Sequence, residues 1–350
     1  MLRRGGSNSR PSGYEPDELP LLYFAMWGAN IRAEGLPAKQ FLIFYLRSQT
    51  VKSFFKSLQL AMKIGFVSIF GKPNAGKSTL LNALMGEKLA IVSSKVQTTR
   101  HRIKGILTEK DYQVIFSDTP GIIEPKYKLH EKMMHAVKNS LEDADVAILL
   151  VDINDNWEDC DAIFSSLRLK SPAIVALNKI DKAGKEKKEK AQQFFSAKNY
   201  CKKVVAFSAL HGFKKQEFMN SILEYLPDGD PFYSGDEISD LPTKFFVSEM
   251  IREKIYDLFE EEIPYHTTVL VQEFKEKSTL IKIRADIIVH RETQKGIILG
   301  EGGKMIKKLG TEARKDIEAF LQQKVFLELL VKVKPKWREN ELYLKEYGYN

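Results

Sequence analysis

The sequence predicts an α/β domain, a mostly parallel sheet with helices on both faces, followed by a smaller α+β domain. Three observations predict this. Residues 63–70 form an apolar strand pattern that runs into a glycine-rich loop and then a helix pattern. Strand-like and helix-like segments then alternate up to Leu226, as in a parallel sheet. After a turn-rich stretch, the order becomes one helix, two strands, two helices and one strand.

The glycine-rich loop, residues 71–78, fits the pattern G-x-x-x-x-G-K-[ST]. Glycines in this pattern let backbone N–H groups turn toward phosphates, while the lysine reaches the outer phosphates and the hydroxyl binds Mg²⁺. The helix pattern that follows directs its N-terminus at the anion. The expected nucleotide contacts are Gly71, Lys72, Pro73, Asn74, Ala75, Gly76, Lys77, Ser78 and Thr79.

Strand patterns lie at 144–151 and 173–177. The tetrapeptide that follows the second, residues 178–181, is expected to select the base of the nucleotide. The carboxylate of Asp181 can accept hydrogen bonds from N1–H and the 2-amino group of guanine, whereas adenine has neither donor, so the predicted nucleotide is GTP. Asn178 would bridge the base edge to the phosphate loop, and the Lys179 stem would lie along the purine. After the strand at 204–207, a backbone N–H would meet the guanine carbonyl. The expected contacts are Asn178, Lys179, Ile180, Asp181, Ser208, Ala209 and Leu210.

A further strand pattern, residues 112–117, ends in Asp118, Thr119, Pro120 and Gly121. A carboxylate at this strand end would hold Mg²⁺, and Gly121 would direct its N–H at the terminal phosphate. Ile122 follows, at the position where Ras-like enzymes carry a glutamine that orients water. An isoleucine cannot position a nucleophile, so hydrolysis would depend on neutralising charge in the transition state.

These elements, in this order, resemble the translation-factor-related GTPases and specifically the Era family, over about residues 63–350. The resemblance implies a first switch segment at residues 97–100, where Thr98 or Thr99 would close on Mg²⁺ in the GTP state; Thr99 is the preferred choice. It also implies that Asn74 helps to bind K⁺ and that a slow intrinsic GTPase is stimulated by K⁺. The implied catalytic residues are Asn74, Lys77, Thr98, Thr99 and Gly121. The implied Mg²⁺ ligands are Ser78, Thr99 and Asp118.

The second half of the chain resembles the bacterial-type, or type II, KH fold. Its helix and strand patterns fall at 244–261, 267–274, 280–289, 295–321 and 325–333. The turn-rich stretch before them is expected to be a linker. The predicted organisation is a leader at 1–61, a GTPase domain at 62–226, a linker at 227–241 and a KH domain at 242–350.

A G-x-x-G loop at residues 300–303 lies between the last two helix patterns. In KH modules such a loop lets the nucleic-acid backbone come close, so the predicted ligand is unpaired RNA. Residues 282–338 carry fourteen Lys and Arg against seven Asp and Glu. A solvated basic face is the alternative, and Glu301 departs from the basic residue common in the family. The expected RNA contacts are Gly296, Gly300, Glu301, Gly302, Gly303, Lys304, Lys307, Lys308, Arg314 and Lys315.

The Era resemblance implies a function in small ribosomal subunit assembly and 16S-type rRNA maturation, through binding of the rRNA 3′ end. It implies a cytoplasmic monomer with peripheral contact to the inner membrane, and no DNA partner. A kinase or ATPase with a phosphate loop would not explain Asp181. A signalling switch that acts on a membrane or protein effector would leave the basic half without a role.

Overall composition fits these expectations. The net charge of +8 suits an acidic partner. Cys160 and Cys201 have neither metal-ligand nor redox spacing, which favours a reducing compartment. No apolar run is long enough to cross a bilayer. The leader is expected to be a disordered tail, with an amphipathic helix at 51–62, or an upstream extension before a natural start at Met62, which is preferred; a transit peptide is the minority interpretation.

Overall fold

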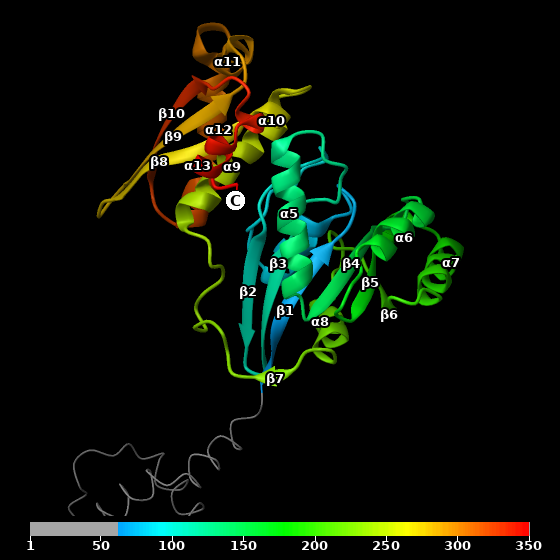
Figure 1. Cartoon of the computed structure of the whole chain (residues 1–350). Coiled ribbons are helices and arrows are strands. Elements are labelled where there is room, and N and C mark those ends of the chain that lie inside the picture. The colour runs from blue at the N-terminus through cyan, green and yellow to red at the C-terminus, as the bar shows by residue number, and fades with distance from the viewer. Residues whose placement is uncertain (1–61, 350) are drawn as a thin grey trace, which may run out of the picture. The chain divides into compact units, whose positions relative to one another are not determined.

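A computed structural model describes residues 62–349, and the expectations for the leader lie outside the described residues. The first domain is built on one sheet, whose strand order is β2-β3-β1-β4-β5-β6 (Figure 1). β2 is antiparallel to β3, and the other neighbours along this path are parallel. The strands are β1 (Met62–Phe70), β2 (Ile103–Glu109), β3 (Tyr112–Asp118), β4 (Val146–Asp152), β5 (Ala173–Asn178) and β6 (Cys201–Ala206).

Helices cover both faces of this sheet. One apolar cluster joins alternate strand residues such as Ile69 to α4 and α8, and a second joins Phe70 and its equivalents to α5, α6 and α7. Because both faces are buried, the strands are continuous apolar runs, as the sequence indicated. The helices are α4 (Lys77–Met85), α5 (Lys128–Asp143), α6 (Trp157–Ser166), α7 (Lys185–Ser196) and α8 (Lys215–Leu223), with a 3₁₀ turn η1 (Ile180–Lys182).

The predicted linker is tied to the first sheet. Its residues 228–229 form the short strand β7 (Asp228–Gly229), which pairs with β1. Farther on, the Gln113 side chain of β3 accepts hydrogen bonds from the N–H groups of Phe232 and Tyr233. The linker composition therefore describes a segment that lies along the sheet.

The second domain has a three-stranded sheet in the order β10-β9-β8, with β9 antiparallel to β8 and parallel to β10. Its helices pack on one face through residues such as Ile251, Ile287 and Leu309. The predicted order of helix, two strands, two helices and strand is confirmed, except that the first predicted helix, 244–261, ends at Leu258 and a short helix, α10, precedes the first strand. The elements are α9 (Thr243–Leu258), α10 (Ile263–His266), β8 (Thr268–Glu276), β9 (Ile281–Val289), α11 (Glu292–Leu299), η2 (Glu301–Gly303), α12 (Lys304–Leu321) and β10 (Val325–Val333).

A C-terminal segment that the sequence did not predict follows β10. It contains η3 (Trp337–Glu339) and α13 (Glu341–Glu346). Its buried aromatic and apolar side chains, among them Trp337 and Leu344, pack with Leu129 and Met133 of α5 and with Ile288 of β9. This segment therefore joins the two domains, which belong to one compact unit, Ala61–Asn350.

Candidate nucleotide site and nucleic-acid interface

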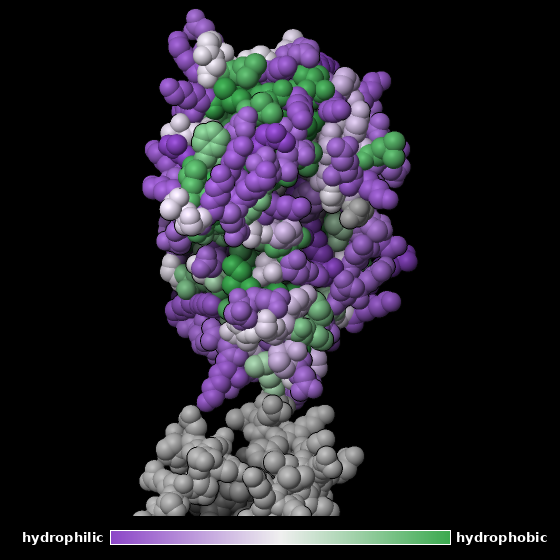
Figure 2. All heavy atoms as spheres, turned by 90° about the vertical axis from the view of Figure 1, so that its left-hand side faces the viewer, coloured by the Kyte–Doolittle hydropathy of each residue, from purple (hydrophilic) through white to green (hydrophobic). Residues whose placement is uncertain are grey.

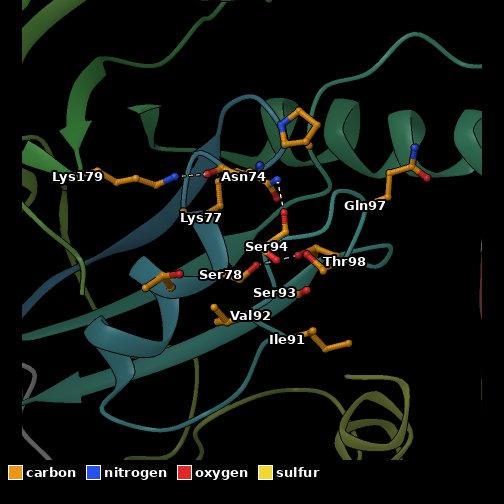
Figure 3. Close-up of a pocket in the computed structure, with 15 residues that line it drawn as sticks. Asn74, Lys77, Ser78, Ile91, Val92, Ser93, Ser94, Gln97, Thr98 and Lys179 are labelled. Atoms are coloured by element: carbon orange, nitrogen blue, oxygen red, sulfur yellow. Dashed lines mark hydrogen bonds between the residues drawn. The ribbon is translucent and has the colours of Figure 1, made fainter. Parts of the chain in front are cut away.

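The phosphate loop connects the end of β1 to the start of α4 and lines a pocket of about 260 Å³ (Figure 3). Gly76 has a φ of 97°, and a Cβ there would lie 2.4 Å from Nδ2 of Asn178, so both conformation and space require glycine. Lys77 is buried, and its Nζ donates to the carbonyls of Gly71 and Lys72 at 3.2 and 2.9 Å. Burial lowers the pKa of Lys77 to about 8, against the attraction of Asp118. The loop thus holds a desolvated cation at its centre.

Three oxygen groups meet at the start of α4. The Asp118 carboxylate Oδ2 accepts hydrogen bonds from the hydroxyls of Ser78, at 2.7 Å, and Thr99, at 3.2 Å, and the two hydroxyls lie 2.8 Å apart. Asp118 is fully buried; burial raises its pKa, while Lys77 and the two hydroxyls oppose that rise. Its Oδ1 has no hydrogen-bond partner among the described residues. Thr99, rather than Thr98, places its hydroxyl in this cluster.

This cluster fits a Mg²⁺ ion. Hydroxyl and carboxylate oxygens are the ligands that Mg²⁺ takes, together with phosphate oxygens and water. The orphaned Oδ1 of Asp118 supplies a buried acceptor that a cation would satisfy. Within residues 62–349 no group of three or more His, Cys, Asp or Glu side chains could hold a metal. A Mg²⁺ ion here would therefore be held by one carboxylate together with hydroxyls and nucleotide phosphates.

The segment after β3 approaches the phosphate loop closely. A Cβ on Gly121 would lie 2.9 Å from the backbone nitrogen of Pro73, so only glycine allows this approach. The hydroxyl of Thr119 donates to the Ile69 carbonyl at 2.7 Å and fixes the start of the segment; Pro120 is buried. The Ile122 side chain packs against the apolar cluster of Phe70 and its neighbours, so no polar side chain stands at this position.

The base-selecting residues are joined to the phosphate loop through Asn178. Its side-chain Oδ1 accepts the N–H groups of Lys179, at 2.8 Å, and Ala209, at 2.9 Å, while Nδ2 donates to the Ala75 carbonyl at 3.0 Å. One buried amide thus connects the phosphate loop to the two segments assigned to the base, residues 178–181 and 208–210.

Lys179 and Asp181 lie at the rim of the base site. Nζ of Lys179 donates to the Asn74 carbonyl at 2.8 Å and pairs with Asp152 at 2.7 Å. Asp181 is exposed, and a hydrogen bond from Ser208 holds the pKa of its carboxyl below the ordinary value, so the group is an ionised acceptor at neutral pH. Ile180 is half-buried, and Leu210 is largely exposed.

Comparison with known proteins supports the same assignment. Residues 66–179 match the family described as 50S ribosome-binding GTPase, and residues 262–338 match the KH domain. The chain is 43% identical over 291 residues to GTPase Era of Staphylococcus haemolyticus, which covers 82% of this chain and 97% of the relative. It is also 43% identical over 294 residues to GTPase Era of Caldanaerobacter subterraneus, with 83% and 99% covered.

The chain belongs to the Era family of GTPases. A solved structure agrees: the crystal structure of Era in complex with MgGDPNP and nucleotides 1506–1542 of 16S ribosomal RNA superposes with a TM-score of 0.79 at 40% identity. It covers 82% of this chain and 99% of the solved one. The predicted family, fold class and GTPase activity are therefore confirmed.

The second candidate site of this Era-family GTPase is the G-x-x-G loop. Gly300, Gly302 and Gly303 have φ values of 68°, 57° and 76°, a region that L side chains rarely adopt. A Cβ on Gly300 would strike Met305 at 2.6 Å, whereas one on Gly302 or Gly303 would meet nothing within 4 Å. The latter two positions, like Gly296 in α11, therefore leave open space that a nucleic-acid backbone could use.

A groove of about 300 Å³ lies beside this loop, between α12 and β10. Its walls combine Leu327 and Leu329 with Lys307 and Arg314. Helix α12 carries five exposed cations, of which Lys307 and Arg314 line the groove: Lys304, Lys307, Lys308, Arg314 and Lys315. Glu301 pairs with Lys304 at 3.4 Å, and both side chains are largely exposed, so this ion pair is weak and can be replaced by a ligand phosphate.

The surface of the second domain also presents apolar groups. Figure 2 shows apolar side chains among hydrophilic ones in the upper part of the molecule, where the second domain lies in Figure 1. The large apolar side chains of this domain that are exposed include Ile297 of α11 and Phe326 and Leu330 of β10. Phe326 and Leu330 alternate with Leu327 and Leu329 along β10, so they lie on the sheet face opposite the helices.

Two buried arginines bond the first switch segment to the second domain, and the sequence did not predict these contacts. Arg252 of α9 is buried, pairs with Glu249 and donates to the Thr98 carbonyl. Arg100 is buried and donates to the carbonyls of Thr267, at 2.7 Å, and Pro264, at 2.9 Å. Arg100 lies in the predicted switch segment 97–100, whereas the signal for Arg252 was a charged residue on a helix pattern, which normally indicates a solvated face.

No helix in the part of the chain that the structure describes is long and apolar enough to span a membrane. Cys160 is buried, which raises the pKa of its thiol to about 11, and Cys201 is half-buried; neither forms a disulfide.

Proposed function

We propose that this Era-family GTPase binds the unpaired 3′ end of small-subunit rRNA in its G-x-x-G groove and acts in subunit assembly and 16S-type rRNA maturation. The nucleotide controls how tightly the groove holds RNA. Support comes from the Era relative that was solved with MgGDPNP and 16S nucleotides, and from the basic groove beside α12. One observation supports control of RNA binding by the nucleotide: the first switch segment is hydrogen-bonded to both domains.

Within this segment, consecutive residues face opposite partners. The hydroxyl of Thr99 is hydrogen-bonded to Ser78 and Asp118 in the oxygen cluster that fits Mg²⁺. Its neighbours are held by the second domain, because Arg252 donates to the Thr98 carbonyl and Arg100 donates to the Thr267 carbonyl. A change in ligation at Thr99 must therefore change the contacts to the second domain, or the reverse.

The earlier part of the loop makes the same kind of contact with α9. Nζ of Lys95 donates to the Phe259 carbonyl at 2.7 Å, and the N–H of Val92 donates to Glu253 at 3.2 Å. Helix α9 in turn packs on α12 and is linked to it by the Lys254–Asp316 ion pair at 2.8 Å. Since α12 begins at the G-x-x-G loop, α9 is the element through which nucleotide state and RNA groove influence each other.

The test compares RNA affinity in two nucleotide states. We expect an oligonucleotide of the 16S 3′ end to bind about 5- to 150-fold more tightly with a non-hydrolysable GTP analogue than with GDP, the usual range of coupling. Tyr256→Phe should reduce this ratio, because it removes the hydroxyl that donates to the Gln97 carbonyl at 2.9 Å and keeps the ring. A scrambled RNA and a DNA of the same sequence are the controls.

Two results would reject the proposal. Equal RNA affinity with the analogue and with GDP would remove the coupling. Equal affinity for the 3′-end RNA and the scrambled RNA would show that the 3′ end is not the specific target, whether or not the nucleotide changes RNA affinity.

Hydrolysis itself, we infer, is slow and stimulated by K⁺. The Asn74 side chain donates to the Ser94 carbonyl at 2.7 Å, so it lies between the phosphate loop and the switch loop. A monovalent cation beside it would do part of the work of an arginine finger, because Ile122 offers no polar group. We expect KCl to raise the rate at least about tenfold over NaCl, and Asn74→Ala to abolish the difference. Equal rates in both salts would exclude the cation.

The residue roles, the domain limits at 226 and 242, a monomeric state and a cytoplasmic location with peripheral contact to the inner membrane are part of the same proposal. The positive net charge of +8 supports contact with anionic lipids. Cosedimentation with anionic vesicles, but not with neutral ones, tests the membrane contact, and equilibrium sedimentation tests the monomer.

A further inference from the structure

A buried histidine connects the two segments that sense the nucleotide. His130 lies near the start of α5, in the region that follows Gly121, and is 3% exposed. Its Nε2 lies 3.1 Å from Oε1 of Gln97 in the first switch segment. Its Nδ1 accepts the N–H of Lys126 at 3.3 Å. Since Nδ1 is an acceptor, the neutral ring carries its proton on Nε2 and donates it to Gln97.

The surroundings of His130 keep the ring neutral. The Tyr127 ring stacks on it with the ring centroids 3.8 Å apart, and the guanidinium of Arg338 lies 4.4 Å from the Tyr127 centroid. Burial lowers the pKa of His130 to about 4, and the cations that face it reinforce the shift: Arg338 from the C-terminal segment, Arg100 from the switch segment and Lys126 before the helix.

Gln97 is held in an unfavourable backbone conformation by its contacts. Its φ is 59°, in the left-handed region, which is unfavourable for an L residue. Two bonds oppose this cost: Tyr256 donates its hydroxyl to the Gln97 carbonyl, and His130 donates to the side chain. In Figure 3 the Gln97 side chain points away from Asn74 and Lys77. Gln97 therefore acts as an anchor for the loop, and its neighbours Thr98 and Thr99 face the pocket.

We propose that His130 is a positioning residue for GTP hydrolysis. As a neutral donor to Gln97, it joins the first switch loop to helix α5 and keeps the Thr99 hydroxyl beside Asp118. This rests on the proposed opening and closing of the switch loop with the nucleotide, and it is independent of the RNA target. The Gln97 contact occupies the Nε2 proton, so His130 moves no proton in the reaction.

Two substitutions separate the hydrogen bond from packing. His130→Phe keeps a ring against Tyr127 and loses the donor, whereas His130→Gln keeps an N–H donor at a similar reach. We expect His130→Phe to lower kcat/KM and the affinity for a non-hydrolysable GTP analogue by a common factor of about tenfold, the effect of one lost hydrogen bond, with GDP affinity unchanged. His130→Gln should stay within about twofold of the parent chain.

The pH dependence of nucleotide affinity distinguishes a hydrogen-bonding role of His130 from a packing role, because packing alone would not depend on the protonation of the ring. Opening the loop removes Arg100 and the cover that Gln97 gives the ring, so the pKa of His130 should rise from about 4 toward its ordinary value, while Tyr127, Arg338 and Lys126 stay beside the ring. Because closure lowers the pKa, closure is fully favoured above about pH 6.5 and loses preference as the pH falls toward 4. The ratio of GTP-analogue to GDP affinity should therefore fall between pH 7.5 and 5.5 in the parent chain, by up to about tenfold, and this fall should be absent in His130→Gln.

The outcomes are distinct. An unchanged rate in His130→Phe, or the same pH slope in His130→Gln as in the parent chain, overturns the role of His130. If His130→Phe does not fold, the pH slopes of the parent chain and His130→Gln still decide. If RNA affinity ignores the nucleotide but the His130 variants behave as expected, only the proposed function fails.

Discussion

At the centre of the nucleotide site, Asp118, Lys77 and Asn178 are buried and hydrogen-bonded, whereas the cations around residues 300–303 are exposed. Asp118, Lys77 and Asn178 are all nearly inaccessible to solvent. Among the loop cations, Lys304 is 78% exposed and pairs only with Glu301. A buried group that loses its partner costs its full desolvation energy, while an exposed charge is screened by water and salt. Single substitutions should therefore have large effects at the first site and small, additive, salt-dependent effects at the second.

The largest expected effect is that of Asp118→Asn. The amide cannot balance a divalent cation, so the Mg²⁺-dependent rate of GTP hydrolysis should fall by about 100-fold or more. Hydrolysis measured against Mg²⁺ concentration checks this, with Asp111→Asn, in the exposed turn between β2 and β3, as the matched control. A loss of less than about fivefold would mean that the buried cluster does not hold the metal.

Asp181→Asn should change which base is bound. The substituted amide can no longer accept from N1–H and the 2-amino group of guanine, and each hydrogen bond to a charged acceptor contributes about 1.5–3 kcal/mol. GTP affinity should fall by about 100-fold or more. Xanthosine triphosphate carries a carbonyl in place of the 2-amino group, so it should bind the variant better than GTP does. Competition binding of the two nucleotides measures this; if GTP remains preferred, Asp181 does not read the base.

How far the sequence predicted these two regions depends on the range of the contacts. The phosphate loop and the Asp181 tetrapeptide are contiguous, so their residue types and spacing already specify the chemistry. The bond from Tyr256 to Gln97 joins residues far apart in the chain, and a pattern of strands and helices does not indicate it. The C-terminal segment was missed for the same reason, because Trp337 becomes a core residue only against α5 and β9.

At the second site, Gly303→Asp should have an intermediate effect. The new side chain projects into the open space beside the loop and adds a negative charge where RNA phosphates would lie. RNA affinity should fall about tenfold, or about 1.4 kcal/mol, while GTP hydrolysis stays unchanged. Gly235→Asp, on an exposed part of the linker, adds the same charge and should leave RNA affinity unaltered. Equal losses in both variants would show that net charge alone matters.

The smallest expected effect is that of Lys308→Ala. Its side chain is exposed and no salt bridge holds it in the described residues, so it should supply one screened phosphate contact. RNA affinity should fall about two- to threefold at physiological salt, and the slope of log affinity against log salt should decrease by about 0.7 for a single strand. Lys185→Ala, at an exposed position on α7, should change neither quantity. A tenfold loss with an unchanged salt slope would contradict the comparison, because it would mean that Lys308 reads a base from a desolvated position.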